Sequence, residues 1–369
     1  MKLTVPCLFG LEALVADEMK RLQLKEVRSE NGRVHCEGTM ADIARLNVNL
    51  RCGARVLMEL GSFPAPDFEA LFQGVAALPW EHYIPKEGEF PVKGYSINST
   101  LHSVPACQAI VKKASAKRMG QAYGMETLPE TGARYQIQFA IVKDMATLYL
   151  DTSGEGLYKR GYRAQGVVAP LKETMAAALV TLSRYRGKDP FCDPFCGSGT
   201  IAIEAALIAK NRAPGLDRSF SSQKWLNMDK NIWLEAGDEA MDKEFDGNYD
   251  IWAGDIDPAA VELAKHNAKL AGVDDCIRFE VADATKFHRD SEYGQLVCNP
   301  PYGERIMERH EAEELYRQFG AAVKDLPPKW RVLVLSSHTE FERTFGRVAD
   351  KRRKLYNGML KCDVFQYGR

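Results

Sequence analysis

The segment Asp193-Pro194-Phe195-Cys196-Gly197-Ser198-Gly199-Thr200 decides the fold prediction, because it follows a predicted buried strand and opens a predicted helix. Gly197 and Gly199 let backbone N–H groups approach a ligand closely, and the helix N-terminus favours an anionic group there. A dinucleotide-binding fingerprint would place a third glycine where this chain has Ala202. Asp193 also suits an amino-bearing ligand better than a pyrophosphate. The segment therefore predicts either a site for S-adenosylmethionine, which carries an ammonium and a carboxylate, or a tight turn without a ligand.

Strands and helices alternate around this segment from about residue 165 onward, which is typical of a parallel sheet. We expect strands at 191–194, 251–255, 277–281, 296–298 and 331–336, with helices at 171–185, 200–210, 258–271 and 312–324. A final hairpin about Asn357-Gly358 adds antiparallel strands. Residues 211–249 break the alternation, so we place them outside the sheet. The pattern predicts an α/β, Rossmann-like domain.

The first 61 residues predict a smaller unit with the order βαββαβ, including a hairpin about Asn31-Gly32. This order is typical of a ferredoxin-like sandwich. Pro64-Ala65-Pro66 marks a boundary, after which a helix at 67–77 is capped by Asp67. A helix at 104–120, ended by Gly120, and a hairpin about Lys143-Asp144 follow. We therefore predict domains at 1–64, 65–155 and 170–369, with a linker at 156–169.

Composition excludes several classes of protein. The 369 residues carry 49 Lys and Arg against 50 Asp and Glu, so a uniformly basic nucleic-acid coat is excluded. A hydrophobic content of 45% excludes extended disorder. No run of about 18 uncharged apolar residues or secretory leader is found, and the nine cysteines contain no C-x-x-C pair. We expect a soluble, cytoplasmic protein without a metal site, and its oligomeric state stays open.

Three aspartates follow the next predicted strands. Asp255 ends the second strand, where a carboxylate can accept both ribose hydroxyl protons. Asp257 precedes Pro258 and is interpreted as a helix N-cap. Asp283 ends the third strand, where it either accepts a hydrogen bond from an adenine amino group or lies in a solvated loop.

The segment Asn299-Pro300-Pro301-Tyr302-Gly303-Glu304-Arg305 follows the fourth strand. The prolines hold the backbone extended and leave carbonyls without a competing N–H. The Asn299 side-chain oxygen and the Pro300 carbonyl can accept the two protons of an exocyclic amine, and Tyr302 can stack on a flipped base. The alternative is a rigid polar loop. Cys298 invites a covalent mechanism, but its apolar surroundings favour a buried thiol.

These motifs, together with Leu171-Lys172-Glu173-Thr174, resemble class I RNA methyltransferases that modify guanine N2. The segments 151–154 and 159–163 resemble the end of a THUMP domain and its linker. The whole chain is similar to the RlmL-like 23S rRNA guanine-N2 methyltransferases and the related TrmN-type tRNA enzymes. The resemblance implies a seven-stranded class I fold, an S-adenosylmethionine cofactor, a ferredoxin-like plus THUMP RNA-binding region, and Thr174 near the methionine part of the cofactor. The longest family members carry a second methyltransferase domain, so the exact RNA target stays open.

Basic residues suggest where RNA would bind, although solvated basic faces are common. One predicted helix carries four cations without an acid, and the linker mixes cations with Tyr158 and Tyr162. The candidate RNA-binding residues are Lys112, Lys113, Lys117, Arg118, Lys159, Arg160 and Arg163. Residues 351–354, Lys-Arg-Arg-Lys, favour a charged edge strand that discourages aggregation.

The sequence therefore predicts a methyltransferase that uses S-adenosylmethionine to modify guanine N2 in structured RNA, with 23S rRNA as the first choice. In this interpretation Asn299, Pro300 and Tyr302 hold the target base, and Asp193, Gly197, Gly199, Asp255 and Asp283 hold the cofactor. The alternatives are tRNA guanine N2, adenine N6 in DNA, and a non-catalytic RNA-binding protein. A reader of duplex DNA would need an element for the major groove, which we do not identify in the sequence.

Overall fold

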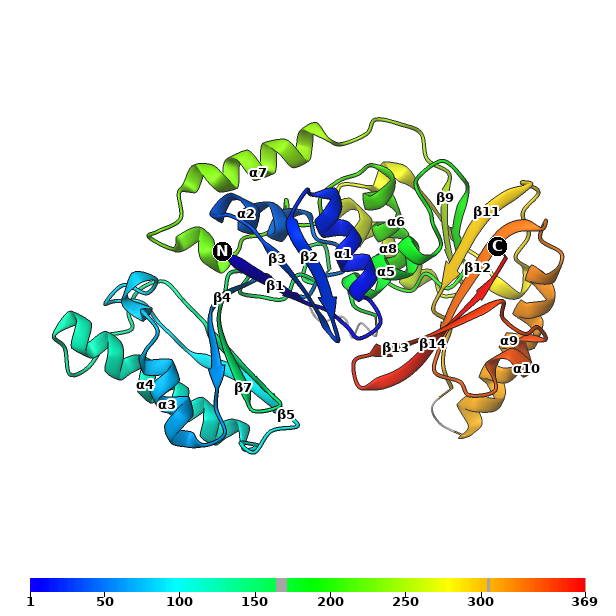
Figure 1. The fold of residues 1–369 in the computed structure, drawn as a ribbon. Coiled ribbons are helices and arrows are strands. Elements are labelled where there is room, and N and C mark those ends of the chain that lie inside the picture. Colours follow the sequence, from blue (N-terminus) through cyan, green and yellow to red (C-terminus); the bar gives the residue numbers. More distant parts are fainter. Residues whose placement is uncertain (164–170, 304–305, 369) are drawn as a thin grey trace.

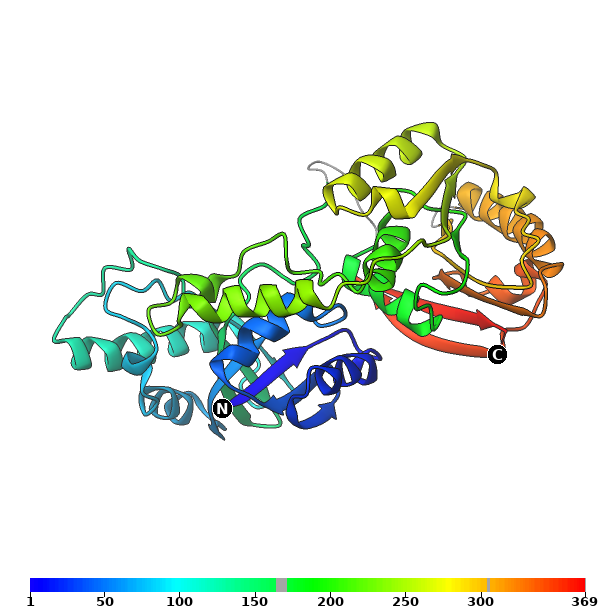
Figure 2. The ribbon, with the colours of Figure 1, turned by 90° about the horizontal axis from the view of Figure 1, so that it is seen from above.

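Two seven-stranded sheets organise the computed structural model, which describes residues 1–163, 171–303 and 306–368 (Figure 1). Viewed from above, the two sheets and their helices lie at opposite ends of an elongated molecule (Figure 2). We name them the N-terminal module (1–155) and the C-terminal module (171–368). The first sheet has the order β2 (Lys25–Glu30), β3 (Arg33–Glu37), β1 (Lys2–Pro6), β4 (Leu57–Pro64), β7 (Met145–Asp151), β6 (Ile137–Val142) and β5 (Val92–Ile97).

The βαββαβ order expected at the start of the chain is confirmed by β1, α1 (Glu12–Arg21), β2, β3, α2 (Met40–Asn49) and β4. Strand β4 pairs with β1 along one edge and with β7 along the other. The boundary predicted after Pro64 therefore falls at the end of a strand that both parts of the N-terminal module share. Local sequence does not show this, because the β4–β7 pairing joins segments far apart in the chain.

The second half of the N-terminal module packs α3 (Phe68–Ala76) against α4 (Val104–Tyr123), with a short 3-10 turn η1 (Trp80–His82) beside them. Asp67 caps α3 by accepting the N–H of Ala70, as predicted. Helix α4 runs past Gly120, which was wrongly expected to end it. Gly124 ends the helix instead, because it adopts a left-handed conformation and donates its N–H to the Gly120 carbonyl.

The C-terminal sheet is parallel except for one strand, the last in the chain. Its order is β10 (Ile277–Val281), β9 (Ile251–Asp255), β8 (Phe191–Asp193), β11 (Tyr293–Cys298), β12 (Lys329–Ser336), β14 (Leu360–Tyr367) and β13 (Lys351–Asn357). The connecting helices are α5 (Glu173–Leu182), α6 (Thr200–Ala209), α8 (Pro258–Leu270), α9 (Ile306–Lys324) and α10 (Phe341–Phe345), with short 3-10 turns η3 (Asp274–Cys276) and η4 (Ala284–Lys286). The α/β prediction and the final antiparallel hairpin are confirmed, and the four strands β8 to β11 end at one edge.

Residues 211–249 lie outside the sheet, as predicted, and they cross over to the N-terminal module. They form η2 (Ser221–Lys224) and α7 (Lys230–Asp242), and α7 lies beside α2 (Figure 1). Trp225 stacks on Tyr135 with ring centroids 4.9 Å apart, and Arg45 on α2 pairs with Glu239 on α7 at 3.0 Å. This insertion therefore fastens the two modules together.

Candidate active site

Loops at the carboxyl ends of the parallel strands line two adjoining cavities of about 400 and 390 Å³. The first cavity lies between the loop after β8 and the start of α8, and its lining includes Leu171, Asp193, Ser198, Thr200 and Asp257. The second cavity reaches the loops after β9, β10 and β11, and its lining includes Asp255, Ile256, Asp283, Pro300 and Tyr302. Phe195, Gly197 and Asn299 line both. Residues that are distant in the sequence thus meet at one sheet edge.

The glycine turn between β8 and α6 uses its two glycines for different purposes. Both have positive φ, 49° at Gly197 and 85° at Gly199. A Cβ atom at Gly199 would lie 2.9 Å from the Cβ of Ala264, so this glycine permits close packing against α8. A Cβ at Gly197 would meet nothing within 4 Å, because the space beside it belongs to the cavities. The turn therefore leaves room for a ligand against Gly197.

Asp193 is an incompletely satisfied buried carboxyl, with 1% of its surface exposed. Its Oδ1 accepts the N–H of Phe195 at 3.1 Å, whereas Oδ2 has no hydrogen-bond partner among the described residues. Burial raises the pKa of Asp193 well above its usual range, and the negative charge of Asp255 raises it further. An ammonium group in the first cavity would donate a hydrogen bond to Oδ2 and place a positive charge beside the carboxylate.

Asp255 braces the glycine turn from the end of β9. Its Oδ2 accepts the N–H of Gly197 at 2.9 Å, and its Oδ1 accepts the N–H of Asp257 at 3.0 Å. Asp257 caps α8 by accepting the N–H of Ala259, with Pro258 in the first turn, as predicted. The N-cap role of Asp257 is thus confirmed, while the ribose contact of Asp255 stays a prediction.

Asp283 caps η4 at the far side of the second cavity. Its Oδ1 accepts hydrogen bonds from the backbone N–H and the hydroxyl of Thr285, and these bonds lower its pKa. Ile256 lines the same cavity and is 70% exposed. The sequence interpretation missed Ile256, although an apolar residue between two aspartates at a strand end was the available signal.

Asn299 lies where the two cavities meet. Its Oδ1 atom is buried and has no hydrogen-bond partner among the described residues. The hydroxyl of Tyr316 on α9 donates to the Pro301 carbonyl, and Cys362 on β14 donates its thiol to the Tyr302 hydroxyl at 3.9 Å. Burial raises the pKa of Tyr302. The loop is held from both sides and presents an open acceptor; Glu304 and Arg305 lie outside the described residues.

Thr174 is not among the described residues that line the two cavities, and its position beside the cofactor stays a prediction. It is 6% exposed and lies in the first turn of α5. Leu171, just before this helix, lines the first cavity instead, together with Thr200 on α6. Arg163 connects these two residues, because it donates to the Leu171 carbonyl at 2.9 Å and to the Thr200 hydroxyl at 3.3 Å.

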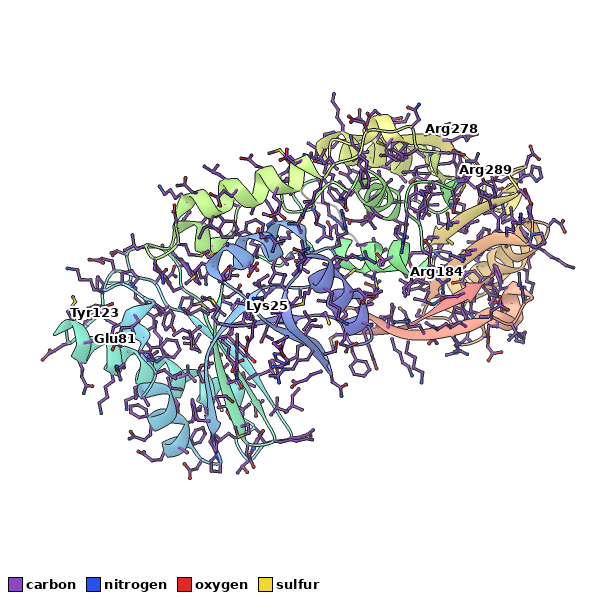
Figure 3. The ribbon with its side chains drawn as sticks, turned by 45° about the horizontal axis from the view of Figure 1, so that its top comes forward. Lys25, Glu81, Tyr123, Arg184, Arg278 and Arg289 are labelled. Atoms are coloured by element: carbon purple, nitrogen blue, oxygen red, sulfur yellow. The ribbon has the colours of Figure 1, made fainter. Side chains whose placement is uncertain are left out.

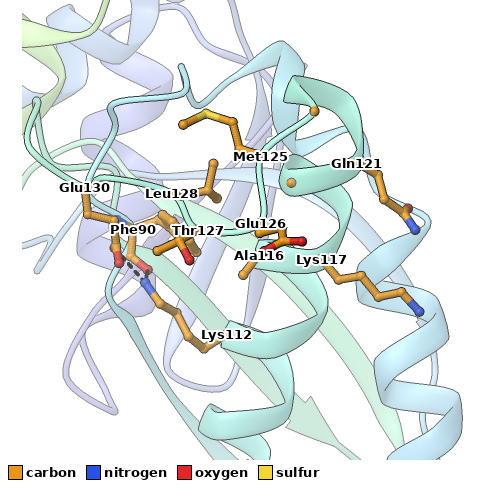
Figure 4. A pocket seen from close by; sticks show the side chains of 12 residues that line it. Phe90, Lys112, Ala116, Lys117, Gln121, Met125, Glu126, Thr127, Leu128 and Glu130 are labelled. Atoms are coloured by element: carbon orange, nitrogen blue, oxygen red, sulfur yellow. Dashed lines mark hydrogen bonds and ion pairs between the residues drawn. The ribbon is translucent and has the colours of Figure 1, made fainter.

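The basic helix α4 divides into engaged and exposed cations. Lys112 pairs with Glu130 at 2.7 Å and lies over the Phe90 ring, at the wall of a groove of about 570 Å³ (Figure 4). Arg118 pairs with Glu81 at 2.6 Å, beside Tyr123 (Figure 3). Lys113 and Lys117 are exposed, and Lys117 Nζ lies 5.5 Å from the centre of the Phe72 ring. The second pair is therefore the better candidate for contact with phosphates.

The predicted linker cations are mostly engaged inside the protein. Arg160 is 3% exposed and pairs with Glu204 on α6 at 3.2 Å, and the Tyr162 hydroxyl donates to the same carboxylate at 3.0 Å. Arg163 pairs with Glu173 at 3.0 Å. The prediction that Arg160 contacts RNA is wrong, because the side chain is buried against a carboxylate that the sequence did not show. Arg163 is partly exposed, and its contact with RNA stays a prediction. Lys159 is exposed and pairs with Glu155 at 2.6 Å; residues 164–169 of the predicted linker lie outside the described residues.

Three further features bear on the interpretation of the sequence: the Cys298 thiol, groups that could hold a metal ion, and helices that could cross a membrane. Cys298 is fully buried, which raises the pKa of its thiol and confirms the interpretation as a core residue. Within the described ranges, no group of three or more His, Cys, Asp or Glu side chains is arranged to hold a metal ion. No helix in the described part of the chain is long and apolar enough to cross a membrane.

Three family profiles match the chain, and they cover nearly all of it. Residues 2–57 match an RlmL ferredoxin-like domain, and residues 65–151 match a THUMP domain. Residues 160–366 match an RMKL-like methyltransferase domain.

Curated relatives are similar along most of this chain. The Bacillus subtilis protein YpsC, named as a candidate RNA methyltransferase, is 45% identical over 97% of this chain and 93% of its own length. A ribosomal RNA large subunit methyltransferase K/L from Syntrophotalea carbinolica is 33% identical over 97% of this chain. The match covers 52% of that relative, so the chain spans about half its length.

Solved structures share the whole architecture. SMU.472, described as a candidate methyltransferase and solved in complex with SAH, aligns with a TM-score of 0.92 at 41% identity and covers 100% of this chain and 98% of its own. A Listeria monocytogenes protein described as a predicted N6-adenine-specific DNA methylase aligns with a TM-score of 0.94 at 47% identity, over 100% of this chain and 96% of its own.

Proposed function

The chain belongs to the RMKL-like methyltransferase family with S-adenosylmethionine as cofactor, and from this premise we propose that it methylates the exocyclic N2 amine of guanine in RNA. One observation carries the proposal: Asp193 and Asn299 line the same first cavity, and each has a buried oxygen with no hydrogen-bond partner among the described residues. One acceptor suits an amino-bearing cofactor, and the other suits the amine that receives the methyl group.

The residues present fit this cofactor. In the proposed arrangement Asp193 accepts from the ammonium, the turn at Gly197 and Gly199 gives the methionine part room, and Asp255 accepts from the ribose hydroxyls. Ile256 and Asp283 lie at the adenine, in the second cavity. When bound, S-adenosylmethionine supplies an electrophilic methyl group on a sulfonium.

The loop after β11 prepares the target amine. The Asn299 side-chain oxygen and the Pro300 carbonyl accept the two amine protons and orient the nitrogen lone pair away from the ring, while Tyr302 stacks on the flipped base. In-line transfer is then accelerated mainly by positioning. The methylated nitrogen is strongly acidic and releases its proton to solvent, so no side chain has to act as a general base.

RNA is the proposed substrate because ferredoxin-like and THUMP profiles match the N-terminal module and the curated relatives are named for RNA. We propose 23S rRNA in the cytoplasm as the first target, with tRNA guanine N2 as the alternative. Adenine N6 in DNA is the description attached to one structural neighbour, and the same loop chemistry would serve that amine. The unpartnered acceptors argue against a protein that binds RNA without catalysis.

The test is methyl transfer by the Asn299→Ala variant to 23S rRNA purified from a deletion strain, with radiolabelled S-adenosylmethionine. The loss of one amine contact is expected to lower turnover by about 100- to 1,000-fold, the range for a lost transition-state hydrogen bond. Calorimetry with S-adenosylhomocysteine is expected to show near-normal affinity.

Asn231→Ala on the exposed face of α7 serves as a matched control and is expected to turn over normally. Normal turnover by Asn299→Ala would remove the proposed amine contacts. Methyl label found in adenine instead of guanine would overturn the proposed base.

A further inference from the structure

The β13–β14 hairpin extends past the sheet edge that carries the active site. Ser336, the last residue of β12, pairs with Asp363 on β14, so the hairpin residues beyond this pair have no β12 partner. Because β12 ends at the carboxyl edge, residues 355–362 project beyond that edge, and Lys354 lies level with it, opposite Asp363. We name residues 354–362 the hairpin tip. Figure 1 shows the hairpin reaching from the C-terminal sheet towards the N-terminal module.

One face of the hairpin is anchored beside the active-site loop. Leu355 and Cys362 lie opposite each other and are buried, and Cys362 donates its thiol to the Tyr302 hydroxyl at 3.9 Å. On the same face, Arg353 donates to the Gly10 carbonyl of the N-terminal module at 3.0 Å. These contacts fix the tip next to Tyr302, the residue proposed to stack on the target base.

The other face carries cations without partners. Tyr356 pairs across the hairpin with Lys361, and Lys354 lies two residues before Tyr356, so the three side chains share this face. Neither lysine forms an ion pair with a carboxylate in the described part of the chain, and both are exposed. Arg352, farther along the same face, is instead neutralised by Asp363 at 2.9 Å. Positive charge is therefore left free at the tip.

Two exposed non-polar side chains accompany these lysines. Met359, at the turn of the hairpin, is fully exposed, and Tyr356 is 40% exposed. A solvent-facing edge strand needs charge to discourage aggregation, but it gains nothing from an exposed methionine and tyrosine. Cations interleaved with an aromatic ring match single-stranded nucleic acid, whose phosphates pair with lysines and whose bases stack on rings.

We propose that the hairpin tip binds the unpaired RNA strand next to the target base. Lys354 and Lys361 pair with its phosphates, Tyr356 stacks on a flanking base, and Met359 packs against the exposed base surface. This inference rests on the proposed function, since it names the partner of the same site. Of the basic segment 351–354, only Lys354 takes part in this proposed RNA contact.

The charge prediction is tested with the double variant Lys354→Glu/Lys361→Glu and the control Lys269→Glu/Lys351→Glu. The control makes the same charge change at two exposed lysines away from the tip. The probe is 23S rRNA from the deletion strain, measured by filter binding over a salt series. The tip variant is expected to bind about tenfold more weakly at low salt, with a salt slope shallower by roughly 1.4, as for two lost single-strand phosphate contacts.

The stacking prediction is tested with Tyr356→Ala and Tyr356→Phe. Loss of the ring is expected to weaken RNA binding by at least about fivefold, and Tyr356→Phe is expected to retain the wild-type affinity. Wild-type affinity in both the tip double variant and Tyr356→Ala, or an equal loss in the lysine control, would overturn the inference. Calorimetry with S-adenosylhomocysteine keeps the two proposals separate. If the wild-type protein does not bind this ligand, the proposed function is contradicted. The RNA affinity of the tip variants tests only the role of the hairpin tip.

Discussion

Two groups of buried polar side chains, one around Arg160 and one at the active site, differ in how many of their polar atoms have hydrogen-bond partners. All three guanidinium nitrogens of Arg160 have acceptors, which are Glu204 and two backbone carbonyls. Asp193 and Asn299 each keep one buried oxygen without a partner among the described residues. Leaving a buried acceptor unpaired costs about 1–3 kcal/mol. The first group therefore holds the fold together, and the second is suited to a ligand that donates hydrogen bonds.

Breaking the satisfied group is expected to have the largest effect on stability. Arg160→Met leaves the Glu204 carboxylate buried without its cation, which should lower the free energy of unfolding by about 3–5 kcal/mol. Lys159→Met, which breaks an exposed ion pair next to it, should change the free energy of unfolding much less. Urea unfolding of both variants measures the difference. Equal losses would mean that the buried pair has no special role.

Changing the unsatisfied group is expected to affect ligand affinity and to leave the fold intact. Asp193→Asn removes the carboxylate charge and should weaken S-adenosylhomocysteine binding by about 10- to 100-fold, the range for a charged hydrogen bond. Isothermal calorimetry measures this loss. Wild-type affinity in Asp193→Asn would show that the open oxygen is not the ammonium acceptor.

The raised pKa of Asp193 gives this comparison a pH dependence. In the folded protein without ligand the carboxyl holds its proton to a higher pH than in the unfolded chain, so its contribution destabilises the fold as pH rises above about 4. Asp193→Asn should therefore gain stability relative to wild type as pH rises from that value. Binding of an ammonium ligand should release a proton from wild-type protein and not from the variant, as measured by calorimetry in buffers of different ionisation enthalpy. Equal proton release by both proteins would contradict this assignment.

A smaller effect is expected for Tyr316, whose hydroxyl holds the loop that carries Asn299. Tyr316→Phe keeps the ring but removes the donor to the Pro301 carbonyl, so turnover should fall about fivefold with unchanged cofactor affinity, as for the loss of a hydrogen bond of about 1 kcal/mol. Tyr367→Phe, which removes a buried donor to the Arg347 carbonyl away from this loop, is the control. Steady-state kinetics that change equally in both variants would show a general packing effect.

The smallest effect is expected on the surface of α4, where engaged and exposed cations lie on one helix. Lys113→Glu/Lys117→Glu should weaken binding to 23S rRNA by about two- to fivefold at low salt, and the difference should vanish at high salt. Filter binding measures both conditions. Unchanged affinity at low salt would move the RNA contact away from this helix.

Local sequence was sufficient where one short segment determines the geometry. The glycine turn at 193–200, the N-cap at Asp257 and the strand ends carrying Asp255 and Asn299 all follow from residue types at fixed spacing. Parallel strands then bring these loops to one edge, so the sequence alone predicts which loops form the candidate site.

Sequence reasoning failed where a partner lies far away in the chain. Arg160 was interpreted as a surface cation because its partner, Glu204, lies on a later helix. Strand β4 belongs to both halves of one sheet because it pairs with β7, which lies far away in the chain. The 211–249 insertion contacts α2 only through tertiary packing. The position of Thr174 near the cofactor rests on family resemblance alone and stays a prediction, although the residue is buried in the first turn of α5.

Mass-spectrometric mapping of 23S rRNA tests the central claim most directly. The strains to compare are a deletion strain and the same strain expressing either the wild-type chain or Asn299→Ala. The account predicts that N2-methylguanosine is missing at one position in the deletion strain, returns with the wild-type chain, and stays missing with the variant. The same guanine methylation in all three strains would contradict it, most directly if an N6-methyladenine in DNA were missing from the deletion strain and returned with the wild-type chain.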